Sequence, residues 1–164
     1  MKVTIITATC NSEQYLEDSI KSVIAQTYKN IEHIVIDCNS SDKTVSIIKK
    51  YEPHIDKWVC EHDLGIYDGL NKGMKLATGD VIGVLHSDDW LASPDVIEEI
   101  VKSFQSHNDV GAIYGDLEYV QRDDVSKTFR FWKGKSYKRS NFKYGWMPAH
   151  PTFYIKKSLS LIHI

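Results

Sequence analysis

The sequence lacks the features that mark several common classes of protein. Its 20 Lys and Arg residues against 22 Asp and Glu residues give a formal net charge of -2, so the positive charge that nucleic-acid-binding domains need is missing. No run approaches the ~20 consecutive apolar residues of a membrane-spanning helix, and residues 1–7 are too poor in apolar residues for a signal-peptide core. The sequence therefore predicts a cytoplasmic protein that does not bind nucleic acid, with attachment to the inner face of a membrane left open.

Cysteines are few, and glycine-rich motifs are absent. The three cysteines, Cys10, Cys38 and Cys60, do not have the spacing of metal-binding cysteines. We expect them to be reduced and largely buried thiols. Neither the phosphate-binding loop fingerprint nor the dinucleotide-binding fingerprint is present, which disfavours P-loop and dinucleotide-binding domains.

The residues that are present have the composition of an ordinary soluble domain. Hydrophobic residues make up 42% and charged residues 26% of the 164 residues, close to the average for globular domains. This length suffices for one domain with a hydrophobic core. We therefore expect a single domain over residues 1–164.

Strands and helices are predicted to alternate through the first two thirds of the chain. Runs rich in β-branched and aliphatic residues predict buried strands at residues 2–9, 31–37, 57–61 and 81–85. Helical spacing of apolar residues, with Ser12 and Ser93 as expected N-caps, predicts helices over residues 12–26, 43–51, 66–76 and from 94 onward. This alternation predicts an α/β fold with a mainly parallel sheet, flanked by helices.

The last third of the chain is expected to differ. Residues 110–120 predict a strand, 122–124 a turn and 127–132 a returning strand, which together form a β-hairpin. The segment 133–143 is rich in Lys and Arg, and the aromatic residues within or beside it are Trp132, Tyr137, Phe142 and Tyr144. A solvated loop over the hairpin is one interpretation of this segment. A surface for an anionic or sugar acceptor is the other, because aromatic faces pack on sugars and cations.

Two adjacent carboxylates follow the strand predicted at residues 81–85. Asp88 and Asp89 come directly after His86 and Ser87, with no basic residue beside them. Neighbouring side chains on a strand point to opposite faces, so the two carboxylates can converge only if the chain turns there. An unpaired acidic pair at a strand end suits a hard divalent cation, which takes oxygen ligands and also holds substrate phosphates. A helix-capping Asp with a solvated neighbour is the alternative interpretation.

Three strand ends are predicted to meet at one edge of the sheet, at residues 7–11, 37–41 and 86–89. The first two lead into helix N-termini, whose free N–H groups attract polar or negatively charged ligand atoms. Asp37 ends an apolar strand and would be costly to bury without a partner. We expect it either to bind a nucleobase or ribose, or to cap the following helix beside Asp42.

Five motifs in the first ninety residues resemble those of family-two glycosyltransferases with the GT-A fold. In chain order they are ITATCN at residues 6–11, SVIAQTY at 22–28, IDCNSSDKT at 36–44, GIYDGLNKG at 65–73, and ATGD at 77–80 running into Ser87-Asp88-Asp89. The likeness is to the N-terminal half of such an enzyme. It implies a Rossmann-like GT-A fold, with residues 1–106 as the nucleotide-sugar-binding half and residues 107–164 as the start of the acceptor half.

The resemblance implies inverting transfer of a sugar from a nucleoside diphosphate donor, expected to be a UDP-sugar, to an acceptor hydroxyl. The acceptor would be a saccharide or lipid-linked molecule in surface polysaccharide or glycolipid synthesis. By this likeness Asp88 serves the ribose and the metal, Asp89 serves the metal, and Mg²⁺ or Mn²⁺ offsets the charge of the diphosphate leaving group. The other expected donor-binding residues are Thr7, Ala8, Cys10, Asn11, Asp37, Asp63, Asp68, Asn71 and Lys72.

The sequence departs from the family pattern in two places. Many relatives carry an acidic doublet where this chain has Asp37-Cys38, so the nucleobase contact is expected to fall on Asp37 alone or to change. The family's general base usually lies beyond the segment resembled by residues 150–154, and residues 158–164 do not resemble the family's continuation. We therefore expect a truncated or altered end, with exposed apolar surface or a homodimer.

If the chain is active, the base for the acceptor must come from inside it. Asp116, after an apolar run, is the first candidate and His150 the second, because transfer needs a carboxylate or imidazole within reach of the acceptor oxygen. For His150 we favour a metal or phosphate role over that of a base. The alternative function is a catalytically incomplete fragment that binds a nucleotide sugar or acts as a partner module. Two-component receivers and haloacid-type phosphatases are disfavoured, because both need an acidic cluster after the first strand.

Overall fold

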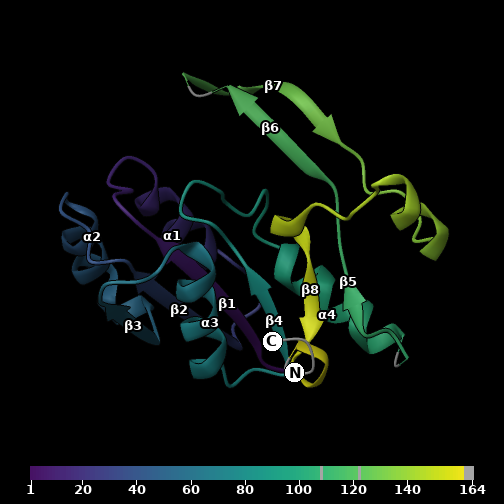
Figure 1. Cartoon of the computed structure of the whole chain (residues 1–164), viewed down its shortest axis with the longest axis horizontal. Coiled ribbons are helices and arrows are strands. Elements are labelled where there is room, and N and C mark those ends of the chain that lie inside the picture. Colours follow the sequence, from purple (N-terminus) through teal and green to yellow (C-terminus); the bar gives the residue numbers. More distant parts are fainter. Residues whose placement is uncertain (108, 122, 161–164) are drawn as a thin grey trace.

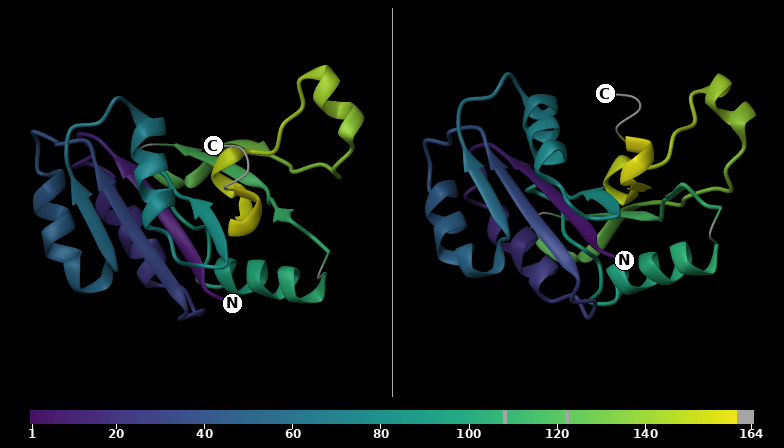
Figure 2. Two further views of the ribbon diagram at one scale, coloured as in Figure 1. Left: turned by 60° about the horizontal axis from the view of Figure 1, so that its bottom comes forward. Right: turned by 90° about the horizontal axis from the view of Figure 1, so that it is seen from below.

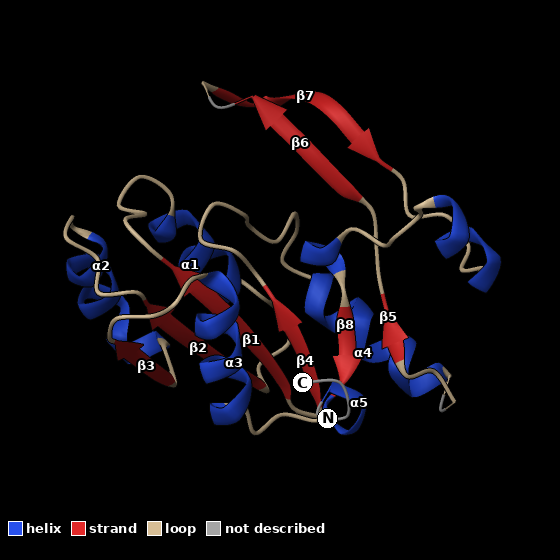
Figure 3. Cartoon of the chain, viewed as in Figure 1, coloured by secondary structure: helices blue, strands red, loops and turns tan. Residues whose placement is uncertain are grey.

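A six-stranded sheet forms the centre of the computed structural model, which describes residues 1–107, 109–121 and 123–160 (Figure 1, Figure 3). The strand order is β3-β2-β1-β4-β8-β5. The strands are β1 (Val3–Thr9), β2 (Ile31–Asp37), β3 (Lys57–Cys60), β4 (Val81–Val84), β5 (Ala112–Ile113) and β8 (Tyr154–Lys156). The strands β1 to β4 pair in parallel, whereas β8 is antiparallel to β4 and β5. The predicted α/β fold with a mainly parallel sheet is confirmed.

Helices cover both faces of this sheet (Figure 2). They are α1 (Leu16–Ile24), α2 (Thr44–Tyr51), α3 (Ile66–Leu76), α4 (Val96–Ser106) and the short α5 (Lys157–Ser160), with 3-10 turns η1 (Glu52–His54), η2 (Arg139–Tyr144) and η3 (His150–Thr152). Ile6 and Ile36 pack under α3, whereas Ile5 packs with Phe104 of α4 on the opposite face. The central strands are apolar on both faces because both faces are covered. None of the described helices is long and apolar enough to cross a membrane.

Two glycines allow unusually close packing in the sheet region. A Cβ atom on Gly73 of α3 would lie 2.4 Å from Cγ2 of Ile6, and one on Gly83 of β4 would lie 2.2 Å from Cε1 of Tyr154. These separations are too short for any real side-chain contact. Gly73 therefore lets α3 lie directly on β1, and Gly83 lets the buried Tyr154 ring lie across β4.

A separate hairpin, formed by β6 (Leu117–Gln121) and β7 (Asp124–Trp132), projects away from the central sheet (Figure 1). The prediction of a hairpin is confirmed, but the prediction of one strand over residues 110–120 is wrong. β5 ends at Ile113 in the central sheet, and β6 pairs only with β7. Between β5 and β6 the Gly115 N–H donates to Thr152 Oγ1 (3.2 Å). A side chain of η3 therefore holds the segment that connects these two strands. Arg122 of the predicted turn and residues 161–164 of the chain's ending lie outside the described residues.

Two helices begin later than the sequence predicts. α1 begins at Leu16 rather than directly after Ser12, and α4 begins at Val96 with Asp95, not Ser93, as its N-cap. The Ser12 N–H instead donates to the side chain of the residue that opens α2 (2.7 Å). The Ser93 hydroxyl donates to the Asp95 carboxylate. Both serines therefore stabilise loops ahead of the helices that they were expected to cap.

Candidate functional site

The loops after β1 and β2 bind each other at the carboxyl edge of the sheet. Asn11 and Asn39 have positive φ angles of 48° and 70°, a left-handed conformation that turns the chain sharply after each strand. The Asn11 N–H donates to Ser40 Oγ (2.8 Å), and the Ser41 N–H donates to Asn11 Oδ1 (2.9 Å). Asn11 therefore holds the second loop while its side chain stays at the exposed edge predicted for donor contacts.

Cys10 and Cys38 form a disulfide between these two loops. Thr9 lies beside Asp37 in the parallel register of β1 and β2, so the residues that follow them face each other. The expectation of reduced, buried thiols is wrong for this pair, and Cys10 is exposed. Cys60 is the free cysteine and is half-buried. Sequence spacing gave no sign of the disulfide because the strand register creates it.

Asp37 is fully buried, and the protein itself uses its carboxylate. Oδ2 accepts hydrogen bonds from the N–H groups of Asn39 (3.1 Å) and Ser40 (2.9 Å) and from the Cys60 thiol (3.1 Å). The Ser40 hydroxyl donates to Oδ1. The hydrogen bond to Asp37, together with burial, raises the pKa of the Cys60 thiol. Asp37 thus orders the turn after β2 and does not cap α2, whose N-cap is Lys43.

The side chains of two other predicted donor-binding residues, Thr7 and Ala8, lie inside the protein. Thr7 is fully buried, and its Oγ1 atom lies 3.1 Å from Nε2 of the buried His33. Ala8 is buried under α3, where its Cβ would be 3.5 Å from a Cβ on Gly69. Neither side chain reaches the surface at which the sequence analysis expected donor contacts.

Asp88 and Asp89 lie in the turn that follows β4. The Asp89 N–H donates to the His86 carbonyl (3.1 Å), so the chain does reverse there. Asp88 is exposed and Asp89 is half-buried. Burial, reinforced by the charge of Asp88, raises the pKa of Asp89 to about 6, and His150 is the neighbouring group that opposes this rise. The pair is therefore a local excess of negative charge, with an imidazole rather than a lysine or arginine beside it.

Two histidines meet beside this acid pair. The Nε2 atoms of His86 and His150 are 3.1 Å apart, and their rings lie edge to face with centroids 5.1 Å apart. Burial and the proximity of His150 lower the pKa of His86. One ring must donate the proton that the other accepts. The structure thus brings His150 from the last third of the chain to the acid pair, and adds His86, for which the sequence analysis proposed no role.

A pair of serine hydroxyls joins the loop after β1 to the turn after β4. Ser12 Oγ lies 2.9 Å from Ser87 Oγ, and the Ser19 hydroxyl of α1 donates to the His86 carbonyl (3.3 Å). The Leu85 N–H also donates to the Ile6 carbonyl (3.0 Å), continuing the β1–β4 pairing to the edge. The predicted meeting of strand ends is therefore present, with Ser12 and Ser87 as contacts that the sequence analysis missed.

The donor set at the acid pair fits a divalent cation that is bound partly by substrate. Within residues 1–107, 109–121 and 123–160, no group of three or more His, Cys, Asp or Glu side chains could form a metal cage. Mg²⁺ and similar ions commonly use one or two carboxylates together with waters and substrate phosphates. Asp88 and Asp89 have the oxygen donors for this mode of binding, and His150 is close enough to oppose the rise in the pKa of Asp89.

The remaining predicted donor-binding residues lie on α3 and the loop before it. Lys72 Nζ pairs with Glu61 (3.0 Å) and Asp68 (3.1 Å), which raises the pKa of Lys72 and lowers that of Asp68. Asp63 Oδ1 accepts from a backbone N–H two residues on (3.0 Å). Asn71 is half-buried on the helix. The positive charge of Lys72 is thus matched within the protein, and a phosphate would have to compete with two carboxylates for it.

Asp116 lies where the chain crosses from β5 to β6. Its side chain is exposed, and Oδ1 accepts a hydrogen bond from the Gly134 N–H (2.7 Å). This contact closes the base of the hairpin. The structure therefore brings His150, rather than Asp116, into contact with the residues around the acid pair.

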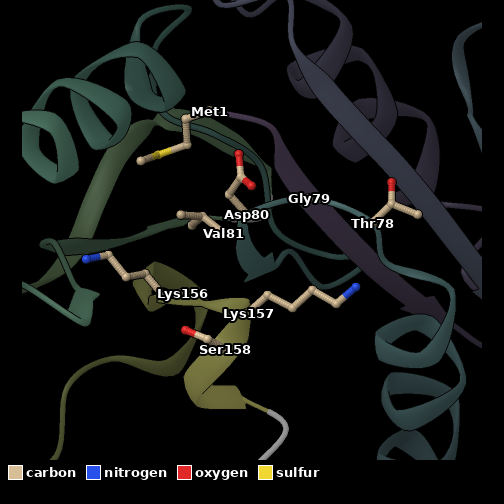
Figure 4. A pocket seen from close by; sticks show the side chains of 8 residues that line it. All are labelled: Met1, Thr78, Gly79, Asp80, Val81, Lys156, Lys157 and Ser158. Atoms are coloured by element: carbon tan, nitrogen blue, oxygen red, sulfur yellow. The ribbon is translucent and has the colours of Figure 1, made fainter.

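The described cavities lie away from the acid pair. One pocket of about 490 Å³ lies at the amino-terminal end of β1 and β4, and its lining residues are shown in Figure 4: Met1, Thr78, Gly79, Asp80, Val81, Lys156, Lys157 and Ser158. A second pocket of about 330 Å³ is lined by residues of α1, β2 and η1, including His33 and His54. Neither of these two pockets is lined by Asp88 or Asp89.

The family model for glycosyl transferase family 2 matches residues 4–158. The chain belongs to glycosyl transferase family 2. It is 39% identical over 114 residues to an uncharacterised glycosyltransferase of Mycobacterium tuberculosis strain CDC 1551 / Oshkosh, covering 69% of this chain and 44% of that protein. It is 30% identical over 117 residues to a PGL/p-HBAD biosynthesis glycosyltransferase of Mycobacterium bovis strain BCG / Pasteur 1173P2, covering 70% and 46%. This family-2 chain thus spans less than half the length of these curated relatives.

Two solved structures share the fold of this family-2 chain. Staphylococcus aureus TarS 1-349, in complex with UDP-GlcNAc, has a TM-score of 0.75 at 19% identity and covers 99% of this chain and 47% of that chain. The mannosyltransferase PcManGT from Pyrobaculum calidifontis, in complex with GDP-Man and Mn²⁺, has a TM-score of 0.64 at 24% identity and covers 76% and 37%. At these identities the likeness is one of fold, and the expected GT-A-like fold is confirmed.

Proposed function

We propose that this chain carries the donor-binding part of a metal-assisted glycosyltransferase that uses a nucleoside diphosphate sugar, with UDP as the favoured nucleotide. The main support is the half-buried acid pair Asp88–Asp89 at the carboxyl edge of the sheet, where burial raises the pKa of Asp89 to about 6. A diphosphate is itself negatively charged, so it can bind beside such a pair only when a cation lies between them. Membership of glycosyl transferase family 2 gives the class of donor.

Asp88 and Asp89 are the proposed ligands of Mg²⁺ or Mn²⁺. When bound, the ion would supply the positive charge that stabilises the departing diphosphate. Asp88 is the more exposed of the two and is also proposed to accept a hydrogen bond from the ribose. The exposed side chain of Asn11 and the half-buried Asn71 are the polar groups proposed to contact the rest of the nucleotide.

The proposed reaction is an inverting displacement at the anomeric carbon of the sugar. The acceptor oxygen forms a bond to that carbon while the bond from the carbon to the diphosphate oxygen breaks, and the acceptor proton passes to a base. Asp116 is proposed as that base through Oδ2, while its Oδ1 accepts from the Gly134 N–H at 2.7 Å. His150 is proposed to contact the phosphates or the metal, because it lies against His86 beside the acid pair.

The proposed acceptor is a saccharide or lipid-linked molecule of surface polysaccharide or glycolipid synthesis, reached from the cytoplasmic side of a membrane. The relative named for PGL/p-HBAD biosynthesis supports this choice. A homodimer is a further part of the proposal, and sedimentation equilibrium of the chain tests it directly.

Calorimetric titration with UDP tests metal-bridged donor binding. We expect UDP to bind in Mn²⁺ and to bind at least about tenfold more weakly in EDTA, because the cation neutralises the acid pair. Asp89→Asn should remove the Mn²⁺-dependent part of the affinity. The matched control Asp18→Asn changes an exposed acid on α1 and should leave it intact. Equal UDP affinity in Mn²⁺ and EDTA would contradict the metal bridge.

Donor binding without transfer is the second candidate function. It is supported by the position of Asp116, the first base candidate, which accepts from the Gly134 N–H at the base of the hairpin. Incubation with radiolabelled UDP-sugars and Mn²⁺ separates the two candidates. Release or transfer of sugar that disappears in Asp89→Asn supports an enzyme, whereas donor binding with no turnover supports a binding module.

A further inference from the structure

Charge is divided very unevenly along this chain. Residues 125–164 contain nine of the 20 basic residues and none of the 22 acidic residues, a net charge of +9, which leaves -11 for residues 1–124. The near-neutral total of -2 hides this division. The molecule is therefore strongly dipolar, and any interaction of its last forty residues with a polyanion is favoured by long-range electrostatics.

Most of this positive charge lies on β7 and the segment after it, residues 125–147, here called the basic aromatic arm. Its basic residues are Lys127, Arg130, Lys133, Lys135, Lys138, Arg139 and Lys143. Among the described ion pairs only Lys127 has an acidic partner in the arm region, Asp124 at 2.9 Å. The other six basic side chains have no ion-pair partner within the described residues and are free to meet a negatively charged surface.

The same arm carries most of the exposed apolar surface. Seven of the 13 large hydrophobic side chains that are exposed among the described residues lie on it: Val125, Phe129, Phe131, Tyr137, Phe142, Tyr144 and Met147. Tyr144 is 88% exposed. Proteins seldom concentrate exposed aromatic and aliphatic side chains in one segment unless that segment binds a partner.

The arm is an ordered surface because aromatic rings brace it from within. Trp146 lies 5.5 Å from the Phe142 ring and 5.8 Å from the Tyr114 ring, measured between centroids, in edge-to-face contacts. The Arg130 guanidinium lies 5.4 Å from the ring centroids of both Tyr119 and Trp132. The half-buried rings of Tyr114, Trp132 and Trp146 therefore connect the arm to itself and to the segment before it.

We propose that the basic aromatic arm docks this chain on the surface of an anionic phospholipid membrane. Unpaired Lys and Arg residues would meet the lipid phosphates, and the exposed Phe, Tyr and Met side chains would enter the interfacial region. The net charge of -11 on residues 1–124 is repelled by the same surface, so the arm approaches first.

A neutral saccharide is the less favoured occupant of this surface. Sugar hydroxyls are typically bound by carboxylates and amides around one or two aromatic rings. Residues 125–147 contain no Asp or Glu, and the Glu118 carboxylate on the paired strand β6 already accepts a hydrogen bond from Thr128. Phe129, Phe131 and Met147 also have no polar atom to offer a hydroxyl, whereas lipid tails need none. This inference does not depend on the proposed transferase activity.

Docking in this way would leave the candidate site close to the membrane. The arm continues into η3, where His150 contacts His86 beside the acid pair, and Figure 1 shows the hairpin beyond the carboxyl end of β4. A lipid-linked acceptor would then approach the site from the surface to which the arm is bound.

Co-sedimentation with vesicles tests the proposal. The probes are phosphatidylcholine vesicles with about one quarter phosphatidylglycerol, and vesicles of phosphatidylcholine alone, at low salt. We expect at least about tenfold stronger partition onto the anionic vesicles, falling as salt is raised. Lys133→Gln/Lys138→Gln should weaken partition about 25-fold, because each basic residue near an anionic surface contributes about fivefold. Tyr144→Ser/Met147→Ser should remove the part of the binding that resists salt.

A matched control variant, Lys49→Gln/Lys75→Gln, removes two exposed lysines of α2 and α3, and it should change partition by less than about twofold. Circular dichroism melts of all variants confirm folding, since every altered side chain is exposed. Partition that is equal for the arm and control variants would overturn the proposal, as would equal binding to both kinds of vesicle. Binding to a soluble anionic polysaccharide but not to vesicles would assign the arm to an acceptor instead.

Discussion

Two aspartates at the same edge of the sheet have opposite surroundings. Asp37 is fully buried, and backbone N–H groups, a hydroxyl and a thiol donate to its carboxylate. Asp89 is only half-buried, yet burial and the Asp88 charge raise its pKa to about 6. The more deeply buried carboxylate thus has several hydrogen-bond donors of the protein, as a buried charge requires, whereas burial of Asp89 is reflected in its raised pKa.

Acidic residues with a structural role and acidic residues with a candidate functional role thus differ in their surroundings. Asn11 and the Cys10–Cys38 disulfide join the loops after β1 and β2, and Asp37 accepts from the loop that follows it. The turn after β4 contains two carboxylates whose negative charge remains for a bound group to neutralise. Such unmatched groups, placed in an accessible position, are typical of binding and catalytic sites.

The largest expected effect is that of Asp37→Ala. The substitution removes a fully buried carboxylate and leaves the N–H groups of Asn39 and Ser40 without their acceptor, so we expect the free energy of unfolding to fall by about 3–5 kcal/mol. Urea unfolding followed by circular dichroism measures this. The exposed control Asp18→Ala should cost less than about 0.5 kcal/mol. Similar losses in the two variants would show that the buried Asp37 carboxylate contributes no more to stability than an exposed one.

Cys10→Ser/Cys38→Ser should have the next largest effect. The disulfide closes a loop between residues separated by 28 in sequence, so its loss should lower the free energy of unfolding by about 2–4 kcal/mol in non-reducing buffer. Dithiothreitol should lower the stability of the unmodified chain by the same amount and leave the double variant unchanged. Identical unfolding midpoints of the two proteins in the absence of reductant would contradict a disulfide in solution.

Glu32→Gln tests a buried carboxylate that is matched by cations. Glu32 is 1% exposed and accepts from Thr4 (2.7 Å), Thr78 (2.7 Å) and Lys57 (3.0 Å). Burial alone would raise the pKa of Glu32, but the hydrogen bonds from Thr78, Thr4 and Lys57 hold it well below its usual range. We expect the substitution to cost about 2 kcal/mol at neutral pH.

The pH dependence of this loss has a definite sign. Because the pKa of Glu32 is lower in the folded than in the unfolded state, its stabilisation is present above the unfolded pKa of about 4.3 and is lost as the pH falls below it. The difference between Glu32→Gln and the unmodified chain should therefore shrink on acidification. A difference that stays constant between neutral pH and pH values of about 3 would argue against an ionised Glu32 in the folded state.

The smallest expected effect is that of Asp89→Asn, which should raise the free energy of unfolding of the metal-free chain rather than lower it. Folding raises the pKa of Asp89 from about 3.9 to about 6, so the stability associated with this group is lost as the pH rises towards neutrality. Asp89→Asn should therefore stabilise the metal-free chain by about 1 kcal/mol at neutral pH, after allowance for solvent screening of a half-exposed group. A lower melting temperature of Asp89→Asn in EDTA would show that the protein already compensates this charge.

Local patterns in the sequence predicted much of the fold and part of the site. The β-branched runs that became β1 and β2 and the apolar run that became β4 were recognisable because a buried parallel strand is apolar on both faces. The acid pair could also be located, since it follows such a run directly. Thr7 and Ala8 were expected at the site but lie inside, because alternate residues of a fully covered strand have no route to the surface.

The sequence by itself determined the α/β alternation, the family motifs and the position of Asp88–Asp89, all of which depend on residues close together in the chain. Only the tertiary structure decided that Cys10 bonds to Cys38, that Asp37 is used internally and that His150 meets His86. It also decided that residues 110–120 divide between two sheets. The physical reason is that these contacts follow from strand register and from the path of the chain in space, and neither is encoded in the spacing of residues within a single segment.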